Sequence, residues 1–132
     1  MKKFYGAFLL GAFCILTFCI AGCDFNSAQQ KLVVTATAYN SVEAQTSQHP
    51  FLTAWGYTLK PDDKVIAISR DLMTMGMTNG TPVHIEGLEG EYIVRDKMNK
   101  RFKKRIDIYM GLDVQKALKW GKKKVTISWK KN

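Results

Sequence analysis

Asp107 is the residue of this chain whose surroundings most favour acid–base chemistry. It stands in the segment RIDIY, residues 105–109, which alternates as a β-strand does. The two isoleucines therefore share one face, and Asp107 lies on the other with Arg105 and Tyr109. A carboxyl group in an apolar strand lowers stability unless it is hydrogen-bonded or has a function. Two interpretations follow: a general acid, or an aspartate locked to Arg105 or to backbone amides.

Asp96 is the second candidate, at the end of the strand-like segment 92–96. A very basic loop, Lys97–Lys104, joins it to the strand of Asp107. If this loop returns as a hairpin does, the two acids come close at one edge of the fold. Neighbouring carboxylates raise the pKa of one of them, which suits a general acid. The surrounding cations favour the ionised form, so burial must outweigh them if Asp107 is to hold a proton at neutral pH.

Other polar residues have weaker cases. Asp71 opens a loop after a strand, where capping a turn is the favoured role. Thr35, Thr37 and Tyr39 share one strand face and could hydrogen-bond a sugar, although such residues are ordinary in strands. Trp55 fits either a sugar-stacking surface or the core.

Metal and cofactor chemistry is not predicted. The two histidines, His49 and His84, are far apart, and no phosphate-cradling glycine loop or nucleophile-elbow sequence is present. His84 stands mid-strand and is interpreted as a structural or surface residue.

The elements that must position these residues are short strands. A strand-like pattern is found at Leu32–Tyr39, Lys64–Ser69, Pro82–Glu86, Glu91–Arg95, Arg105–Tyr109 and Lys123–Trp129, with a shorter extended piece at Phe51–Gly56. A loop is expected at Arg70–Thr81. One helix is expected over Val114–Trp120, with Asp113 as its N-cap and Gly121 as its stop. About six strands and one short C-terminal helix predict a mainly β protein, a small closed barrel.

Residues 1–22 have the pattern of a lipoprotein signal peptide. Lys2 and Lys3 precede an uncharged apolar stretch that ends in Ala21-Gly22-Cys23. We expect cleavage before Cys23 and attachment of lipid to its thiol. A retained membrane anchor is the alternative, because the apolar run is long enough to span a bilayer. Residues 23–31 are then a lipidated tether and residues 32–132 one compact domain. In either case the domain faces the periplasm or the cell exterior.

Charge is distributed unevenly along the chain, which carries +9 overall. Residues 23–94 have four basic and eight acidic side chains, whereas residues 95–132 have fourteen basic and three acidic ones, a net +11. A basic half of this kind favours a polyanionic partner. Nucleic acid is not expected outside the cytoplasmic membrane, where the anions are lipid headgroups, teichoic polymers and the peptide carboxylates of peptidoglycan.

Several segments together resemble the 3D domain, a family named for three aspartates. The segments are Val34–Tyr39, Thr53–Gly56, Val65–Asp71, Gly80–Ile85, Arg105–Gly111 and Ala117–Gly121. The three aspartates are then Asp71, Asp96 and Asp107, and the resemblance covers Leu32–Trp129. It implies a six-stranded double-psi β-barrel related to membrane-bound lytic transglycosylase A and rare lipoprotein A. Many members have a glycine-rich segment where this chain has the bulky Met98–Lys104.

The resemblance also implies an activity, cleavage of the β-1,4 bond between N-acetylmuramic acid and N-acetylglucosamine with formation of a 1,6-anhydro ring. Asp107 is then the catalytic acid and Asp96 its partner. The implied substrate-binding residues are Thr37, Tyr39, Thr53, Asp71, Thr81 and Arg105. The expected partners are peptidoglycan glycan strands and, through the lipid on Cys23, the membrane. No cofactor is implied.

Two other functions remain open. A non-catalytic wall-binding lipoprotein would use the same groove and the basic face. A protein that docks on anionic headgroups through its basic half would lose binding as salt rises.

Overall fold

The computed structural model of the protein describes residues 28–41 and 51–131. The predicted signal peptide, the lipidation site Cys23 and the loop histidine His49 lie outside the described residues. Within the described residues, no helix has the length and apolar character needed to cross a membrane.

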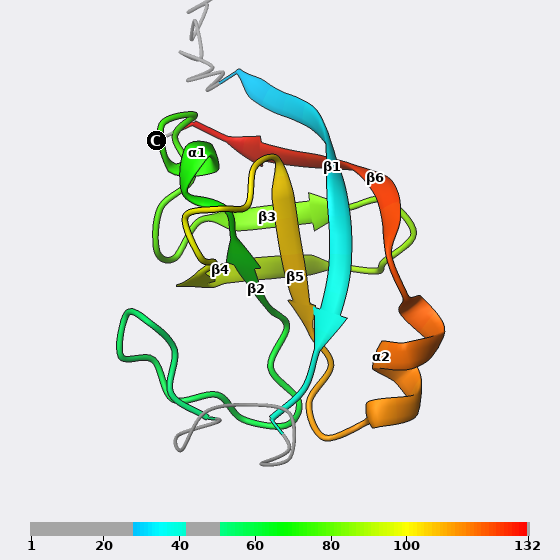
Figure 1. The fold of residues 1–132 in the computed structure, drawn as a ribbon. Coiled ribbons are helices and arrows are strands. Elements are labelled where there is room, and N and C mark those ends of the chain that lie inside the picture. Colours follow the sequence, from blue (N-terminus) through cyan, green and yellow to red (C-terminus); the bar gives the residue numbers. More distant parts are fainter. Residues whose placement is uncertain (1–27, 42–50, 132) are drawn as a thin grey trace, which may run out of the picture.

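Six strands close into a barrel, as the sequence pattern predicts (Figure 1). They are β1 (Gln29–Tyr39), β2 (Val65–Ile68), β3 (Pro82–Ile85), β4 (Glu91–Lys97), β5 (Arg105–Tyr109) and β6 (Lys123–Lys130). The order around the barrel is β1-β5-β2-β4-β3-β6. The pairs β1/β5 and β2/β4 are parallel, and the other four pairs are antiparallel.

The core fills the inside of the barrel, where the inward faces of the strands meet. Its fully buried aliphatic side chains include Val34 of β1, Ile66 and Ile68 of β2, and Ile106 and Ile108 of β5. The alternation of RIDIY thus has the predicted result: both isoleucines are buried, and the intervening aspartate faces outward. The burial of each such side chain contributes about 1.5–3 kcal/mol to stability.

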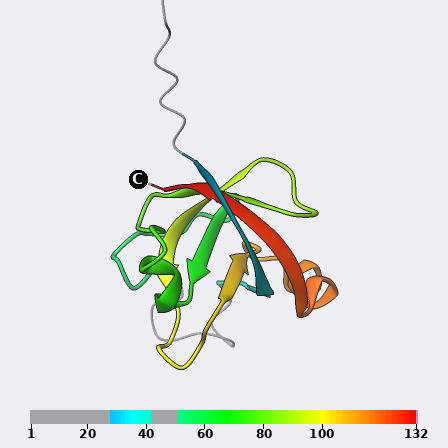
Figure 2. The ribbon, with the colours of Figure 1, turned by 90° about the horizontal axis from the view of Figure 1, so that it is seen from above.

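β1 begins three residues earlier than the strand predicted from Leu32. Residues 29–31, expected in the tether, pair with β6 from Ser128 to Lys130. Their polar side chains gave no sign of a strand. β1 extends this far because β6 offers pairing partners up to Lys130. Figure 2 shows the two strands crossing the barrel side by side.

Two short helices accompany the barrel. α2 (Val114–Trp120) is the predicted one: the Asp113 carboxylate accepts a hydrogen bond from the Lys116 amide at 2.9 Å, and Gly121 ends the helix with φ +66°. α1 (Arg70–Met73) is a single turn within the segment predicted as a loop. The extended piece expected at Phe51–Gly56 is not a strand and forms only one isolated bridge, between Leu52 and Thr58.

The basic loop does not return as a hairpin, the condition under which the sequence placed the two acids close together. β4 and β5 are not neighbours, because β2 lies between them and pairs with both. The loop therefore crosses over the end of β2 to reach β5. A sequence pattern gives strand positions but not which strand is inserted between two others, so this arrangement was not visible from the sequence.

Candidate active site

The inserted strand β2 places Asp96 and Asp107 on either side of one small residue. Ala67 is in register with Asp96 of β4 and with Asp107 of β5. Two strand spacings separate the backbones of the two acids, a distance of about 10 Å. The acids are therefore brought to one site, as predicted, but across a third strand rather than as adjacent partners.

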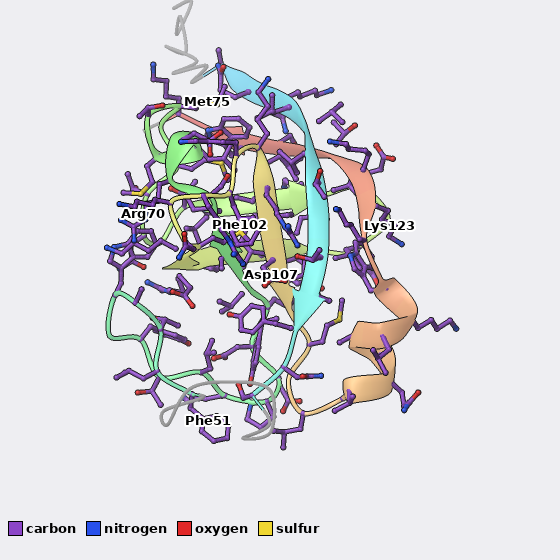
Figure 3. All side chains as sticks on the ribbon, viewed as in Figure 1. Phe51, Arg70, Met75, Phe102, Asp107 and Lys123 are labelled. Carbon is purple, nitrogen blue, oxygen red and sulfur yellow. The ribbon has the colours of Figure 1, made fainter. Side chains whose placement is uncertain are left out.

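A pocket of about 320 Å³ opens over these three strands. Its lining residues are Tyr39, Ala67, Asp96, Lys97, Met98, Asn99, Phe102 and Asp107. Figure 3 shows Phe102 and Asp107 on the same side of the barrel. Because Ala67 has only a methyl side chain, the space between the two carboxyl groups stays open. The volume lies at the lower end of the range for small-molecule sites.

Asp107 accepts one hydrogen bond from a side chain. The Thr37 hydroxyl donates to its Oδ1 at 2.9 Å, and Thr37 is its register partner on β1. The Thr37 oxygen in turn accepts a hydrogen bond from Arg105 Nη2 at 3.3 Å. Among residues 28–41 and 51–131 no ion pair joins Arg105 to Asp107. The arginine therefore acts on the acid through a threonine and does not clamp it.

The pKa of Asp107 is raised above its ordinary value, chiefly because burial disfavours the charged form. The Thr37 hydrogen bond and the charge of Arg105 lower the pKa, and the charge of Asp96 raises it. Burial outweighs the cation, so the pKa shifts in the direction that the general-acid interpretation requires. The neighbouring acid is the smallest contribution, so pairing of carboxylates is not the main cause.

Asp96 is held differently. Its Oδ1 accepts hydrogen bonds from the amides of Ala54 and Lys97, both at 2.8 Å. Burial raises its pKa, while these two amides and the charge of Lys97 oppose the rise. A carboxylate fixed by two amides is suited to positioning and to accepting hydrogen bonds. Asp107, with a single hydroxyl donor, is the better proton donor of the two.

Tyr39 lines the pocket. Its ring lies 5.3 Å from that of Tyr109, centre to centre. Burial, together with the charges of Asp96 and Asp107, raises the pKa of the Tyr39 hydroxyl, so the group stays protonated. Its oxygen is buried and has no hydrogen-bond partner within the described part of the chain. A buried hydroxyl without a partner is costly, so this group lowers the stability of the fold.

The other predicted substrate-binding residues do not line the pocket. Thr53 is buried and accepts a hydrogen bond from the Tyr57 amide at 3.0 Å, which shapes the turn that presents the Ala54 amide to Asp96. Thr81 is also buried, and its hydroxyl accepts from the Thr78 amide at 2.9 Å. Direct contact of these threonines with a substrate stays a prediction.

Asp71, the first of the three aspartates, fixes the basic loop. Its Oδ2 accepts a hydrogen bond from the Lys104 amide at 2.9 Å. Burial favours a higher pKa, but hydrogen bonds from Ser69 and Lys104 and the charge of Lys103 together lower the pKa of Asp71. It is therefore an ionised positioning group beside the site and not part of its lining.

Sequence reasoning missed five of the lining residues, Ala67, Lys97, Met98, Asn99 and Phe102. Ala67 had a weak signal, as the one small residue in an otherwise bulky buried strand. Phe102 had a stronger one, because it is the only aromatic residue in a loop of lysines and arginines.

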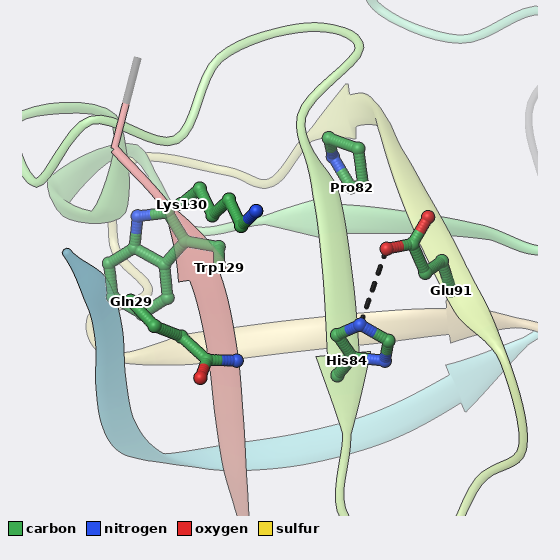
Figure 4. A pocket seen from close by; sticks show the side chains of 6 residues that line it. All are labelled: Gln29, Pro82, His84, Glu91, Trp129 and Lys130. Atoms are coloured by element: carbon green, nitrogen blue, oxygen red, sulfur yellow. Dashed lines mark ion pairs between the residues drawn. The ribbon is translucent and has the colours of Figure 1, made fainter. Parts of the chain in front are cut away.

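A second hollow, of about 260 Å³, lies on the β3–β4–β6 side of the barrel (Figure 4). His84 and Glu91 line it and form an ion pair with 3.2 Å between Nε2 and Oε1. Both side chains are more than half exposed, so His84 is the surface histidine expected from the sequence. This hollow contains no half-buried acid comparable to Asp107. Within the described residues, no cluster of three potential metal ligands occurs.

Replacing Asp107 by Asn should stabilise the protein at neutral pH. A raised folded-state pKa means that the contribution of this acid to stability is complete below the unfolded value of about 3.9 and is lost as the pH rises through the folded value. As the pH rises from the unfolded to the folded pKa, the free energy of unfolding of Asp107→Asn should gain on that of the wild type. The gain is about 1.4 kcal/mol for each unit that separates the two pKa values. Urea unfolding from pH 3 to 8 measures it, and an advantage that does not change with pH would contradict the raised pKa.

Of the comparisons with known proteins, the one with solved structures bears on the fold. No protein-family model and no curated protein matches the chain. Among solved structures, a Streptomyces papain inhibitor is similar at 19% identity with a TM-score of 0.51, covering 76% of this chain and 94% of that one. An expansin of Clavibacter michiganensis is similar at 16% identity with a TM-score of 0.50, covering 76% of this chain. This chain spans half the length of that expansin. The likeness shows that the six-stranded barrel is of the double-psi type.

Proposed function

We propose that this protein is a membrane-anchored lytic transglycosylase that cleaves the β-1,4 bond between N-acetylmuramic acid and N-acetylglucosamine in peptidoglycan. The single observation that carries the proposal is Asp107: a half-buried carboxyl group of raised pKa that lines an open pocket and accepts only one side-chain hydrogen bond. Burial favours the protonated form of such a group, and a protonated carboxyl group can deliver its proton to a glycosidic oxygen.

The arrangement suits a reaction that needs only one acid–base group. Ordinary glycosidases use two carboxyl groups, one as acid and one as nucleophile or base. Here the second carboxylate, Asp96, already accepts two amide hydrogen bonds on one oxygen. A reaction with an internal nucleophile avoids the need for a second free carboxylate and for a bound water.

The proposed step is balanced within the substrate. Asp107 donates its proton to the leaving O4 of N-acetylglucosamine as the bond from C1 of muramic acid to that oxygen breaks. The C6 hydroxyl of the same muramic residue attacks C1 and closes the 1,6-anhydro ring. The Asp107 carboxylate takes the C6 hydroxyl proton and is thereby restored, so no water is consumed.

Anchoring through Cys23 would keep this domain close to its polymer. β1 begins at Gln29, so five residues separate Cys23 from the barrel, a reach of about 18 Å at most when extended. A short tether of this kind would confine the pocket to the layer of wall next to the membrane.

The activity is tested by product analysis. The full chain, purified in mild detergent, is incubated with isolated peptidoglycan, and the soluble fragments are analysed by mass spectrometry. We expect muropeptides that end in 1,6-anhydromuramic acid, lighter by one water than hydrolysed fragments. Hydrolysed fragments alone would indicate a glycosidase, and the absence of any fragment would favour a binding protein.

Thr37→Val tests the support of the acid. The change removes the hydroxyl that donates to Asp107 while keeping the shape of a β-branched strand residue. Because that hydrogen bond lowers the pKa of Asp107, we expect the upper limb of the pH–rate profile to move to higher pH. The orientation of the carboxyl group is also lost, so kcat should fall about tenfold. A matched change, Thr126→Val on β6, should leave both quantities unaltered.

A non-catalytic wall-binding protein is the second candidate. It is favoured by cations stacked on aromatic rings near the site: Lys97 lies 5.8 Å from the Trp55 ring centre and Arg95 lies 4.9 Å from that of Tyr57. The similar structures are named as an inhibitor and an expansin, and a binding role would agree with the inhibitor's title. Retention on peptidoglycan without any cleavage would support this candidate.

A further inference from the structure

The loop beside the pocket carries an unusual density of positive charge. Residues 97–105 include six cationic side chains and no acidic one. We call this set the basic rim: Lys97, Lys100, Arg101, Lys103, Lys104 and Arg105. Among residues 28–41 and 51–131 the only ion pair joins His84 to Glu91, so the basic rim makes no ion pair within this described part of the chain.

The backbone of the basic rim is firmly held. The amides of Lys104 and Arg105 donate to the side chains of Asp71 and Ser69 at 2.9 and 3.0 Å. Arg70 Nε donates to the Met98 carbonyl at 3.2 Å. Lys104 has φ +43°, a left-handed conformation that disfavours a non-glycine residue by about 1–2 kcal/mol. The cations are thus carried by an ordered loop. The strained backbone at Lys104 is of a kind that is found at functional sites.

Phe102 connects the basic rim to the pocket. The guanidinium carbons of Arg101 and Arg105 lie 4.7 and 4.4 Å from its ring centre, and the same ring lines the pocket with Asp107. Arg105 already donates from Nη2 to Thr37, whereas Arg101 is exposed and its stacked guanidinium keeps a planar N–H edge that matches the two oxygens of a carboxylate. The Phe102 ring, which lines the pocket, therefore holds two cations beside it, where they can receive a planar anion.

We propose that the basic rim binds a free carboxylate of the glycan substrate, so that the site selects wall strands whose muramic residues still carry carboxylate-bearing side groups. This inference rests on the proposed function, because it assigns the group next to the bond that Asp107 would cleave. A carboxylate of the wall fits better than a lipid headgroup because the basic rim borders the pocket in which the proposed function places the glycan.

Binding of the carboxylate would also prepare the acid. Arg105 lowers the pKa of Asp107 in the unoccupied site, and it faces Asp107 through the Thr37 hydroxyl, with Asp96 as the opposing negative charge. A substrate carboxylate on Arg105 would offset its positive charge and favour the protonated form of Asp107. The substrate would thus supply part of the electrostatic condition for its own cleavage.

Binding is measured without cleavage in the full chain bearing Asp107→Asn. The probes are peptidoglycan freed of teichoic polymers and the same material with its carboxyl groups converted to amides. The test variant adds Lys100→Gln, Arg101→Gln and Lys103→Gln, all exposed. The control adds Lys116→Gln, Lys119→Gln and Lys122→Gln, which remove the same charge at α2 and the turn after it; none of these residues lines the pocket of Asp107.

We expect amidation of the wall and neutralisation of the basic rim each to weaken binding at least about tenfold, and the two together to weaken it little further. The control should change binding less than about twofold. Equal losses in test and control variants would indicate general charge attraction and overturn the inference. So would binding that ignores amidation but is displaced by inorganic phosphate better than by acetate, which would assign the basic rim to phosphate polymers.

The two proposals fail in different ways. Wild-type protein that releases anhydromuropeptides equally from native and amidated wall would sustain the proposed function and refute the carboxylate site. Selective binding to the native wall without any cleavage would support the carboxylate site and refute the proposed function.

Discussion

Asp107→Asn is expected to reduce anhydromuropeptide release by about 10²- to 10⁴-fold, the range in which a positioned general acid contributes. The amide occupies the volume of the carboxyl group but has no proton of suitable pKa to give to the leaving oxygen. The rate is followed by mass spectrometry of soluble fragments from isolated peptidoglycan, at several enzyme concentrations. Because the change should also stabilise the fold, loss of activity cannot be ascribed to unfolding.

Two matched variants define the specificity of this effect. Asp96→Asn keeps an oxygen able to accept the amide hydrogen bonds of Ala54 and Lys97, so we expect a smaller loss, about tenfold. Asp62→Asn changes an exposed aspartate outside the pocket and should leave the rate unaltered. Equal rates for Asp107→Asn and wild type would remove Asp107 from the chemistry.

Gly111→Ala is expected to cause the largest loss of stability, about 2 to 5 kcal/mol. Gly111 has φ +62°, which disfavours a side chain by about 1–2 kcal/mol. A Cβ there would overlap the backbone carbonyl of Pro61, and such overpacking costs about 1–3 kcal/mol more. The Gly111 carbonyl also accepts a hydrogen bond from the Ser41 amide at 3.1 Å, next to the ends of β1 and β5.

Gly87→Ala is the matched control for that prediction. Its φ is also positive, +82°, but a Cβ there meets nothing within 4 Å. We expect a loss of about 1–2 kcal/mol from conformation alone. Unfolding in guanidinium chloride measures both losses in the free energy of unfolding, provided that the m-value stays the same in the variants. Equal losses for the two variants would mean that the Pro61 segment moves aside, and that the close approach does not fix the ends of β1 and β5.

The sequence predicts the elements of this fold well because each has a local cause. β5 follows from the alternation of RIDIY, and α2 follows from the cap at Asp113 and the stop at Gly121. The closed six-stranded barrel agrees with the number of strands. α1 was not predicted, since a single turn has too few residues to establish a helical period.

For the candidate site, the sequence predicted the central acid, Asp107, but few of the residues around it. Asp107 stood out because a carboxyl group in an apolar strand requires an explanation. The role of Ala67 did not, because it depends on β2 lying between two strands that follow it in the chain. The contact between Thr37 and Asp107 depends likewise on the parallel pairing of β1 with β5. Non-local pairings of this kind leave no local pattern in the sequence.

The most direct test of the central claim is the titration of Asp107 itself. Carboxyl-carbon NMR of labelled protein, assigned by comparison with Asp107→Asn, gives the pKa of this one side chain in the folded protein. We predict a midpoint clearly above the ordinary value of about 3.9, with a further rise in Thr37→Val. A midpoint at or below the ordinary value would show that Asp107 is a permanently ionised group, which would contradict its assignment as the proton donor.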